Sequence, residues 1–249
     1  MQLIDSHCHL DDPRFDADRA AVMARAAAVG VSHLVVPAVA FDGWQKLRAL
    51  AAADGRISPA YGLHPWFCAQ HDQAHLDALP AFLAEAVAVG ECGLDGGRDL
   101  QAEQLYWFAA QLDVAVAMDL PVIVHAHKAL DEVCREIRRR PALRGVIHGF
   151  AGSRQQADHL LAQGFYLGIG SAVTRPQNRC LHQIVAAIPA ERLLIETDAP
   201  DQPPAAHRGA RNEPAFLLEI VEQIATLRGV DTAVFADRCN RNARELFKL

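Results

Sequence analysis

The stretch Pro121-Val122-Ile123-Val124-His125 contains the pattern that decides the fold: a short apolar run, rich in β-branched side chains, that ends on a polar residue. Similar runs recur along the whole chain. Runs of this length and composition are typical of parallel strands that are buried on both faces. We therefore predict eight strands, at residues 3–6, 33–37, 57–62, 86–90, 121–124, 145–147, 165–169 and 193–196.

Amphipathic segments lie between these runs. The clearest covers residues 101–119, where Leu105 and other apolar residues recur at helical spacing. Strands that alternate with helices predict either a closed barrel or an open, doubly wound sheet. We favour the α/β class with a (β/α)8 TIM barrel, because the polar residues follow several different strands and there is no glycine-rich phosphate loop. Residues 1–249 are expected to form a single domain that ends in an extra helix pair, at 214–228 and 231–247.

The composition limits the classes of function. The net charge of −6 argues against broad electrostatic capture of nucleic acid, although not against a local grip on a strand end. The densest basic cluster, at 135–140, is interpreted as the solvated face of an outer helix. No apolar run approaches the roughly 18 residues of a membrane span, and no secretory signal is evident, so we expect a cytoplasmic location. The six cysteines have no CxxC spacing and are expected to be reduced thiols.

His7 and His9 form a His-x-His pair just after the first predicted strand. Alternation along the strand sends both imidazoles, and Asp5 before them, to one face. A lone histidine is more often a hydrogen-bonded core residue. Two imidazoles that face a barrel interior favour metal ligation, because neutral imidazoles suit Zn²⁺ and the neighbouring transition metals.

Four other predicted strands also end in polar residues, namely Glu91, His125, His148 and Asp198. Burying any of these side chains without a partner would be costly. One interpretation is a set of unrelated capping or hydrogen-bonding residues that share one rim. Polar residues at the carboxyl ends of barrel strands are more typical of a catalytic site, so we predict that they join the two histidines in a metal site.

The number of ligands predicts two divalent ions. Four histidines and two carboxylates exceed the three protein ligands of a catalytic zinc with an open position. A bridging carboxylate would divide them between two metals ~3.5–4 Å apart. Glu91 is the predicted bridge, because no lysine occupies the end of the fourth strand. Zinc, magnesium and manganese stay open: histidines favour zinc-like ions, whereas nucleases often use harder ions.

Short motifs follow one another from residue 5 nearly to the C-terminus. They are Asp5-Ser-His7-Cys-His9-Leu10, Gly62-Leu-His64-Pro-Trp66, Gly90-Glu91-Cys-Gly93-Leu-Asp95, Leu120-Pro-Val-Ile-Val-His125, Ile147-His148-Gly-Phe150, Glu196-Thr-Asp198-Ala-Pro200, Arg211-Asn-Glu-Pro214 and Cys239-Asn-Arg-Asn-Ala-Arg-Glu-Leu-Phe247. In this order the chain resembles the TatD family of metal-dependent deoxyribonucleases, within the amidohydrolase-like barrels. After Pro200 it reads Asp201-Gln-Pro-Pro204, where relatives often carry Tyr-Leu, and in this it looks like the branch whose members are often described only as metal-dependent hydrolases.

The resemblance implies a division of the ligands between the two metals. The first ion would be held by His7, His9, Glu91 and Asp198, and the second by Glu91, His125 and His148. Asp198 would also orient the attacking water and take its proton, as a carboxylate beside a metal can. Asp198 and Glu91 are therefore the predicted catalytic residues.

The resemblance also suggests supporting residues. His64 would contact a substrate phosphate, unless it only packs beside Pro65, and Glu196 would orient the ligands by hydrogen bonding. Many relatives carry an arginine two residues after the histidine of the fifth strand, where this chain has His127. His127 would bind phosphate more weakly, or it is an ordinary loop histidine. This departure leaves the choice of substrate open.

The function predicted from these residues is phosphodiester hydrolysis by a metal-activated water, in an exonuclease that acts on the ends of DNA strands. An alternative keeps the site but changes the bond: a small ester, amide or lactone outside nucleic acids, because fold and metal alone do not determine the substrate. A third interpretation is a non-catalytic metal-binding protein or scaffold. Nothing in the sequence favours it, since all six ligand positions are present.

Overall fold

Eight parallel strands form one sheet in the order of the chain, in a computed structural model that describes residues 1–249. Each strand pairs in parallel with the next one. The strands are β1 (Leu3–Asp5), β2 (Val31–Pro37), β3 (Ile57–Tyr61), β4 (Ala88–Asp95), β5 (Val122–His127), β6 (Gly145–Ile147), β7 (Tyr166–Ile169) and β8 (Leu193–Ile195).

The first and last strands meet through a few backbone hydrogen bonds. The Ser6 N–H donates to the Ile195 carbonyl at 3.0 Å, and the Asp198 N–H donates to the His7 carbonyl at 2.9 Å. These bonds bring the segments after β1 and β8 together, so that the sheet curls into a nearly closed barrel. The predicted (β/α)8 barrel is confirmed, and the open sheet is excluded.

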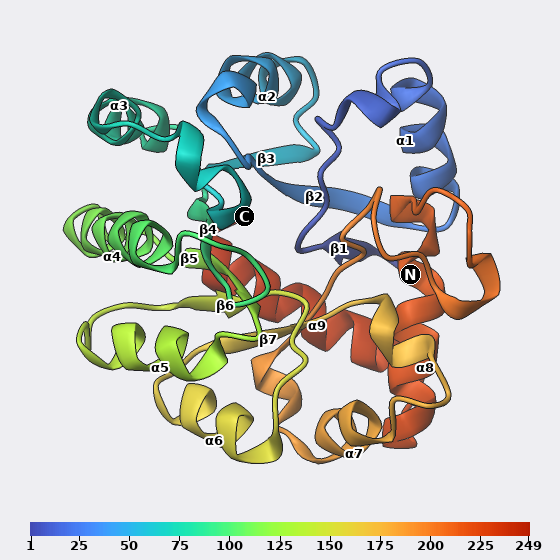
Figure 1. Ribbon diagram of the computed structural model, residues 1–249. Helices are drawn as coiled ribbons and strands as arrows, with labels where there is room; N and C mark the ends of the chain where they lie inside the picture. Colours follow the sequence, from blue (N-terminus) through green and yellow to red (C-terminus); the bar gives the residue numbers. More distant parts are fainter.

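Helices surround the strands on all sides in Figure 1, and α9 crosses behind them. One helix follows each strand and a ninth ends the chain. Both helices of the predicted final pair are present, but the first of them is the helix that follows the eighth strand, so only one helix is additional. None of them has the length and apolar character needed to cross a membrane. They are α1 (Arg19–Ala28), α2 (Phe41–Ala53), α3 (Gln73–Leu83), α4 (Gln101–Ala117), α5 (Leu130–Arg138), α6 (Arg154–Ala162), α7 (Arg179–Ala187), α8 (Leu217–Arg228) and α9 (Thr232–Phe247).

Two apolar clusters fill the molecule. The larger one, of 56 buried residues, lies between the strands and the surrounding helices. The smaller one fills the barrel, because it takes one residue from each strand together with Ala243, Leu246 and Phe247 of α9. Helix α9 therefore closes the amino-terminal end of the barrel, and the polar site is left to the opposite end.

Helix α4 buries three residues of the predicted apolar stripe, Phe108, Leu112 and Ala115, but differs from it in one position. Leu105 is 37% exposed, whereas the side chains of Gln104 and Gln111 are buried. The Gln104 Oε1 accepts a hydrogen bond from the Asp95 N–H at 2.8 Å, and the Gln111 Oε1 accepts one from the Leu63 N–H at 2.7 Å. Buried amides thus satisfy backbone groups that follow two strands, which an apolar side chain could not do.

Strand β4 is shifted relative to the predicted run at 86–90, and Glu91 lies inside it rather than just after it. Ala88 belongs to the cluster within the barrel, whereas Cys92, four residues later, belongs to the outer cluster. Strict alternation would place both on the same face. The pairing of β4 with β5 shifts its register between Val89 and Cys92. This irregularity reverses the alternation and turns Glu91 toward the barrel interior.

Candidate metal centre

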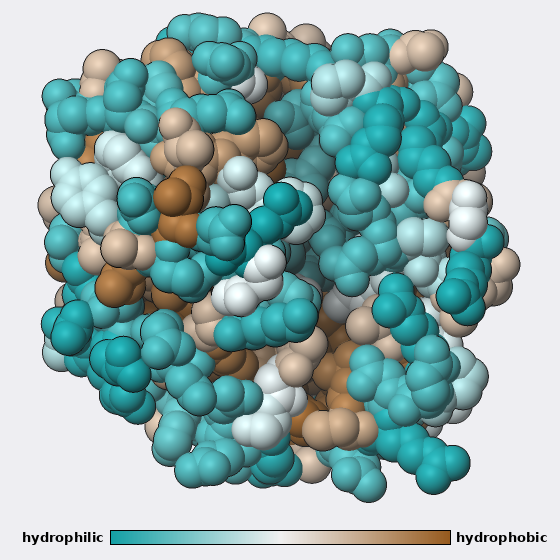
Figure 2. Space-filling view, in the orientation of Figure 1, coloured by the Kyte–Doolittle hydropathy of each residue, from teal (hydrophilic) through white to brown (hydrophobic).

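The mouth of the barrel gathers the six predicted ligand residues around the carboxylate of Glu91. Glu91 and His125 lie within β4 and β5, and the other four residues follow β1, β6 and β8, whose carboxyl ends lie at this side of the barrel. The face seen in Figure 2 is largely hydrophilic and is hollowed near its centre. The exposed fraction of the Glu91 residue is 1%, so its charge is well removed from bulk water.

One oxygen of Glu91 faces the first pair of histidines. The Oε2 atom lies 3.3 Å from His7 Nε2 and 3.4 Å from His9 Nε2. The Oδ1 atom of Asp198 lies 3.5 Å from each of these nitrogens, which are 3.2 Å from one another. The nitrogens of His7 and His9 thus each lie within 3.5 Å of both carboxylates, and the ligand atoms of His7, His9 and Asp198 all lie within 4.8 Å of one another.

The other oxygen of Glu91 faces a different set of imidazoles. The Oε1 atom lies 2.8 Å from His148 Nε2, 3.1 Å from His125 Nδ1 and 3.1 Å from His64 Nε2. The nearest nitrogens of His125 and His148 are 3.2 Å apart. His64 therefore lies among the potential ligand atoms around Glu91, and its ligand atom lies within 4.8 Å of those of Glu91 and His125.

The spacing of the first group fits a divalent ion. Zinc ligands lie about 2.0–2.2 Å from the metal, which in a tetrahedron separates the ligand atoms by about 3.3–3.6 Å. The five distances that join His7, His9, Glu91 and Asp198 run from 3.2 to 3.5 Å. The Oε2 atom of Glu91 is buried without a hydrogen-bond partner. A cation at this point would satisfy it, and the residues therefore fit a metal.

The carboxylates of the site are held in the ionised form. Burial acts to raise the pKa of Glu91, but the charges of His148, His64 and His7 outweigh it and keep that pKa well below its usual value. The pKa of Asp198 is also lowered, because the hydrogen bond with His9 and the neighbouring imidazoles outweigh burial. Ionised carboxylates are the form that binds a metal.

The histidines divide in their response to this environment. Burial lowers the pKa of His64 to about 4, so its imidazole is neutral at pH 7. Burial also acts to lower the pKa of His9, but the carboxylates of Asp198 and Glu91 outweigh it and raise that pKa to about 9. In the absence of an ion a proton on His9 balances the carboxylates, and metal binding must displace that proton.

Glu196, for which the sequence predicts a supporting role, lies beneath His148. Its Oε1 atom is 3.7 Å from His148 Nδ1 and accepts a hydrogen bond from the Gly149 N–H. A Cβ atom on Gly168 would come within 2.2 Å of the Glu196 carboxylate. The glycine in β7 thus leaves the space that this carboxylate occupies.

His127 does not join the cluster. Its side chain is exposed at the end of β5, and it makes no hydrogen bond to the six ligand residues. Asp5 also stays outside. It accepts hydrogen bonds from the hydroxyl group of Thr197 at 2.6 Å and from the N–H groups of Thr197 and His7. Asp5 therefore holds the segments after β1 and β8 together rather than binding a metal directly.

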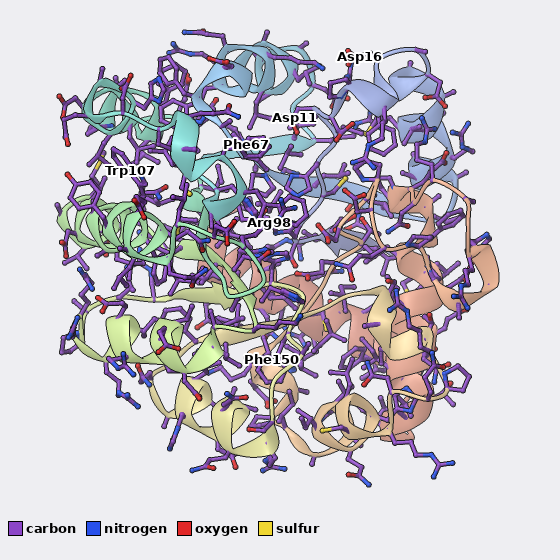
Figure 3. The ribbon with its side chains drawn as sticks, in the orientation of Figure 1. Asp11, Asp16, Phe67, Arg98, Trp107 and Phe150 are labelled. Atoms are coloured by element: carbon purple, nitrogen blue, oxygen red, sulfur yellow. The ribbon has the colours of Figure 1, made fainter.

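Trp66 and its neighbours at the mouth were not assigned a role from the sequence. The indole N–H of Trp66 donates to Asp95 Oδ2 at 2.6 Å, and that oxygen lies 3.7 Å from His125 Nε2. The guanidinium of Arg98 lies 4.6 Å from the centre of the Trp66 ring, and Figure 3 places Arg98 over the middle of the mouth. Trp66 is nevertheless 50% exposed. A fixed, exposed aromatic ring thus stands beside the metal ligands, and only its position directly after His64-Pro65 could have indicated it.

Buried imidazoles and carboxylates clustered at the carboxyl-terminal mouth of a (β/α)8 barrel define a class, the metal-dependent hydrolases. Comparison with known proteins identifies the family: residues 4–248 match the model described as TatD related DNase. The chain belongs to this family, as the sequence motifs indicated.

Similar proteins span the whole chain. A relative from Escherichia coli (strain K12), named uncharacterized metal-dependent hydrolase YjjV, is 36% identical and the match covers 100% of this chain and 98% of the relative. The crystal structure of YjjV superposes with a TM-score of 0.95 at 34% identity, covering 99% of this chain and 98% of that one. A protein from Pantoea vagans (strain C9-1), named 3'-5' ssDNA/RNA exonuclease TatD, is 36% identical over 99% of this chain and 100% of its own length. A TatD family hydrolase from Entamoeba histolytica, at 20% identity and a TM-score of 0.87, supports the fold alone.

Proposed function

We propose that this chain is a two-metal exonuclease that hydrolyses phosphodiester bonds at the ends of single-stranded DNA. The observation that carries the proposal is the position of Glu91. Its Oε2 atom lies within 3.4 Å of His7 and His9, and its Oε1 atom lies within 3.1 Å of His125 and His148. A carboxylate that faces two separate sets of imidazoles is suited to bridge two cations.

The first ion would be held by His7, His9, Glu91 and Asp198, and the second by Glu91, His125 and His148, with His64 also within reach. Paired divalent ions lower the pKa of water and stabilise both the attacking and the leaving oxygen of a phosphodiester. The four histidines favour zinc, whereas nuclease chemistry also suits magnesium or manganese.

Asp198 is the proposed general base. One of its oxygens, Oδ1, faces His7 and His9, and the other, Oδ2, accepts a hydrogen bond from the Gln202 side chain at 2.7 Å. The side chain is therefore held in one orientation at the mouth. A water that approaches the ligand cluster can pass its proton to this carboxylate, whose role is to orient the water and hold the proton.

Two observations favour a nucleic-acid substrate. Several relatives, among them the proteins from Pantoea vagans and Erwinia billingiae, are named 3'-5' ssDNA/RNA exonucleases. Trp66 also presents an exposed indole beside the site, and bases stack on such rings. We further propose that residues 1–249 act as one domain, that the protein is cytoplasmic, and that His64 is the side chain closest to the substrate phosphate.

The test is to incubate the protein with labelled single-stranded oligonucleotides in zinc, magnesium or manganese, beside model carboxylic esters, amides and lactones. We expect nucleotides to be released from one end of the DNA. Asp198→Asn should lower kcat by about 10²–10⁴-fold, the usual contribution of a general base.

Elemental analysis of the bound metal shows whether Asp198→Asn is inactive because the general base is missing or because the protein has lost an ion. The Asp198→Asn variant should keep its bound ions but have a much lower activity than the control variant Asp158→Asn. The control removes the same charge from the exposed face of α6. Cleavage of the small esters, amides or lactones without any cleavage of DNA would overturn the nuclease assignment in favour of a small-molecule hydrolase.

A further inference from the structure

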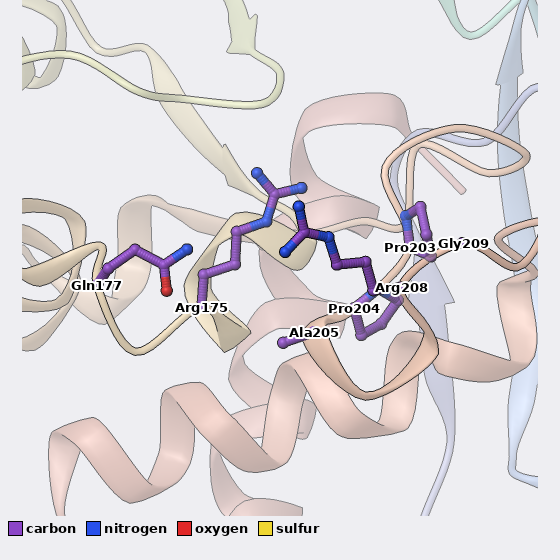
Figure 4. Close-up of a pocket in the computed structure, with 7 residues that line it drawn as sticks. All are labelled: Arg175, Gln177, Pro203, Pro204, Ala205, Arg208 and Gly209. Carbon is purple, nitrogen blue, oxygen red and sulfur yellow. The ribbon is translucent and has the colours of Figure 1, made fainter.

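A second polar pocket lies on the same rim of the barrel, between the loops that follow β7 and β8. It has a volume of about 400 Å³ and is lined by Arg175, Gln177, Pro203, Pro204, Ala205, Arg208 and Gly209. Figure 4 shows the two arginine side chains extended into it, with their guanidinium groups near one another. No acidic side chain lines the pocket, so its two charged groups have the same sign.

The two guanidinium groups have no partner within the protein. Neither Arg175 nor Arg208 takes part in a salt bridge, and neither side chain donates a hydrogen bond. Arg14, elsewhere on this rim, is by contrast held between Asp12 and Asp201 at 2.9 and 2.8 Å. Two like charges that share one pocket repel each other, and an anion between them would remove that repulsion. Arginine pairs with phosphate through parallel, charge-assisted hydrogen bonds.

The pocket is built on a rigid support rather than on free loops. The Ala205 N–H donates to Thr174 Oγ1 at 2.9 Å, and Thr174 Oγ1 donates to the Ser171 carbonyl at 2.7 Å. The hydroxyl group of Ser171 in turn donates to the Gln202 carbonyl. These bonds join the loop that carries Arg175 to the loop that carries Arg208.

The same support connects the pocket to the metal site. The Gln202 side chain donates to Asp198 Oδ2 at 2.7 Å, and Pro203, the next residue, lines the pocket. Gln202, which contacts the proposed base Asp198, is thus followed directly by a residue of the pocket wall. In barrel enzymes the loops after strands seven and eight frequently bind phosphate. The pocket is thus joined to the side of the mouth where Asp198 lies.

We propose that Arg175 and Arg208 form a phosphate subsite, which binds a phosphate group of the strand away from the bond that is hydrolysed. This inference rests on the proposed nuclease function and adds two residues that bind the substrate. It also reconciles the net charge of −6 with a polyanionic substrate, because the positive charge is concentrated at one place on the rim.

The test uses the metal-loaded double variant Arg175→Gln/Arg208→Gln. Its control, Arg135→Gln/Arg138→Gln, removes the same charge from the exposed face of α5. We expect KM for single-stranded oligonucleotides to rise about tenfold in the test variant, with kcat nearly unchanged. The salt dependence of log KM should weaken by about 0.7 for each phosphate contact that is lost. The kinetics on bis(4-nitrophenyl) phosphate, which is too small to reach the pocket, should not change.

A set of oligonucleotides locates the phosphate. In each one a single linkage is replaced by a neutral methylphosphonate, and in one pair the terminal phosphate is present or absent. The wild-type protein should bind one of these oligonucleotides more weakly than the unmodified DNA. The modified position is internal if the subsite binds a backbone phosphate and terminal if it binds an end phosphate. The double variant should bind that oligonucleotide and the unmodified DNA equally well. Equal responses of the two proteins at every position, or an unchanged KM in the double variant, would overturn the subsite.

A binding measurement separates this inference from the nuclease proposal. If no oligonucleotide is cleaved, fluorescence anisotropy of the same oligonucleotides with metal-loaded protein still reports the subsite. An affinity about tenfold weaker in the double variant than in the α5 control would support the subsite although the nuclease assignment had failed. Cleavage that is equally efficient in the variant and the control would remove the subsite and leave the nuclease.

Discussion

Glu196 is the side chain that lies directly beneath His148, one of the proposed metal ligands. Its carboxylate lies 3.7 Å from His148 Nδ1, while His148 Nε2 faces Glu91 at 2.8 Å. A proton on Nδ1, directed at Glu196, leaves the lone pair of Nε2 free for a metal. Carboxylates that receive the second N–H of a histidine ligand determine its tautomer and increase its basicity.

We therefore expect Glu196→Gln to lower the affinity for the proposed second ion by about 10–100-fold, because the neutral amide no longer places a negative charge beside His148. Zinc titration against a chelator of known affinity measures the effect. Glu191→Gln, in the segment just before β8 and largely exposed, is the matched control and should bind metal as the wild type does. A metal affinity that is the same in both variants would show that Glu196 does not act on the ligand.

The motif that contains His64 left two roles open for this residue. The sequence allowed a contact with substrate phosphate or a packing role beside Pro65. The structure places its Nε2 atom 3.1 Å from Glu91 Oε1, as near as the nearest nitrogen of His125. A pattern of residues along the chain does not report this distance, because it depends on where β3 and β4 lie relative to one another.

Among the elements, helix α9 has the most specific contact with the barrel. The Asn240 Oδ1 atom accepts a hydrogen bond from the Ile4 N–H at 3.0 Å, and its amide donates to the Gln2 carbonyl at 2.9 Å. Asn242 donates to the Ala190 and Leu193 carbonyls, both at 2.8 Å. Helix α9 thus joins β1 to the start of β8, at the point where the sheet closes.

We expect Asn240→Ala to lower the free energy of unfolding by about 1–3 kcal/mol, because a buried N–H and a carbonyl lose their partners. Urea denaturation measures the change. Arg241→Ala is the neighbouring control: its side chain is exposed and pairs with Asp237 one turn earlier, so its effect should stay within about 0.5 kcal/mol. If both variants lost the same amount, the hydrogen bonds to β1 would not contribute to barrel closure.

Strand alternation explains part of the site and fails for the rest. Ile123 and Val146 belong to the cluster within the barrel, so His125 and His148, two residues further on, face the interior by simple alternation. Ile4 also faces inward, but His7 is three residues away, and Glu91 stands in the same relation to Ala88. These two ligands reach the interior only because the backbone departs from regular pleating. Such departures leave no clear signal in the residue pattern.

At the scale of the whole molecule, a network of charges joins the beginning of the chain to its last third. Glu213 lies 2.7 Å from Arg25 Nε and 3.0 Å from Arg211 Nη2, and Arg211 also pairs with Asp18 at 2.7 Å. The hydrogen bond from Arg25 lowers the pKa of Glu213, and Arg211 adds to the effect, against a smaller contribution from burial. The network fastens α1 to the segment just before α8.

This network predicts a pH dependence of stability. Because the pKa of Glu213 is lower in the folded protein than in the unfolded chain, its contribution is present above the unfolded value near pH 4.5 and disappears as pH falls through the folded value. At pH 7, Glu213→Gln should lower the free energy of unfolding by about 1 kcal/mol. In strong acid the variant and the wild type should have equal stability.

Urea denaturation over a pH series measures this difference. Glu103→Gln serves as the control, since Glu103 is exposed near the start of α4 and forms no salt bridge. A difference between Glu213→Gln and the wild type that does not depend on pH would contradict the electrostatic origin of the effect.

The sequence by itself determined the kind of fold and the chemistry of the site. Short β-branched runs that alternate with amphipathic segments can bury their apolar faces only in a layered α/β structure. Polar residues at the ends of several such runs must then meet at one end of a barrel, because parallel strands all present their carboxyl ends on the same side. Both inferences depend on local patterns, which is why one chain without a structure was enough for them.

Only the tertiary structure decided which atoms face one another. Four features bring together segments that are far apart in the chain: the inward turn of Glu91, the approach of His64, the buried amides of Gln104 and Gln111, and the pocket that Arg175 and Arg208 share. Their distances depend on the register of the strands and on how β1 meets β8. Those quantities come from packing over the whole barrel, and no stretch of sequence encodes them alone.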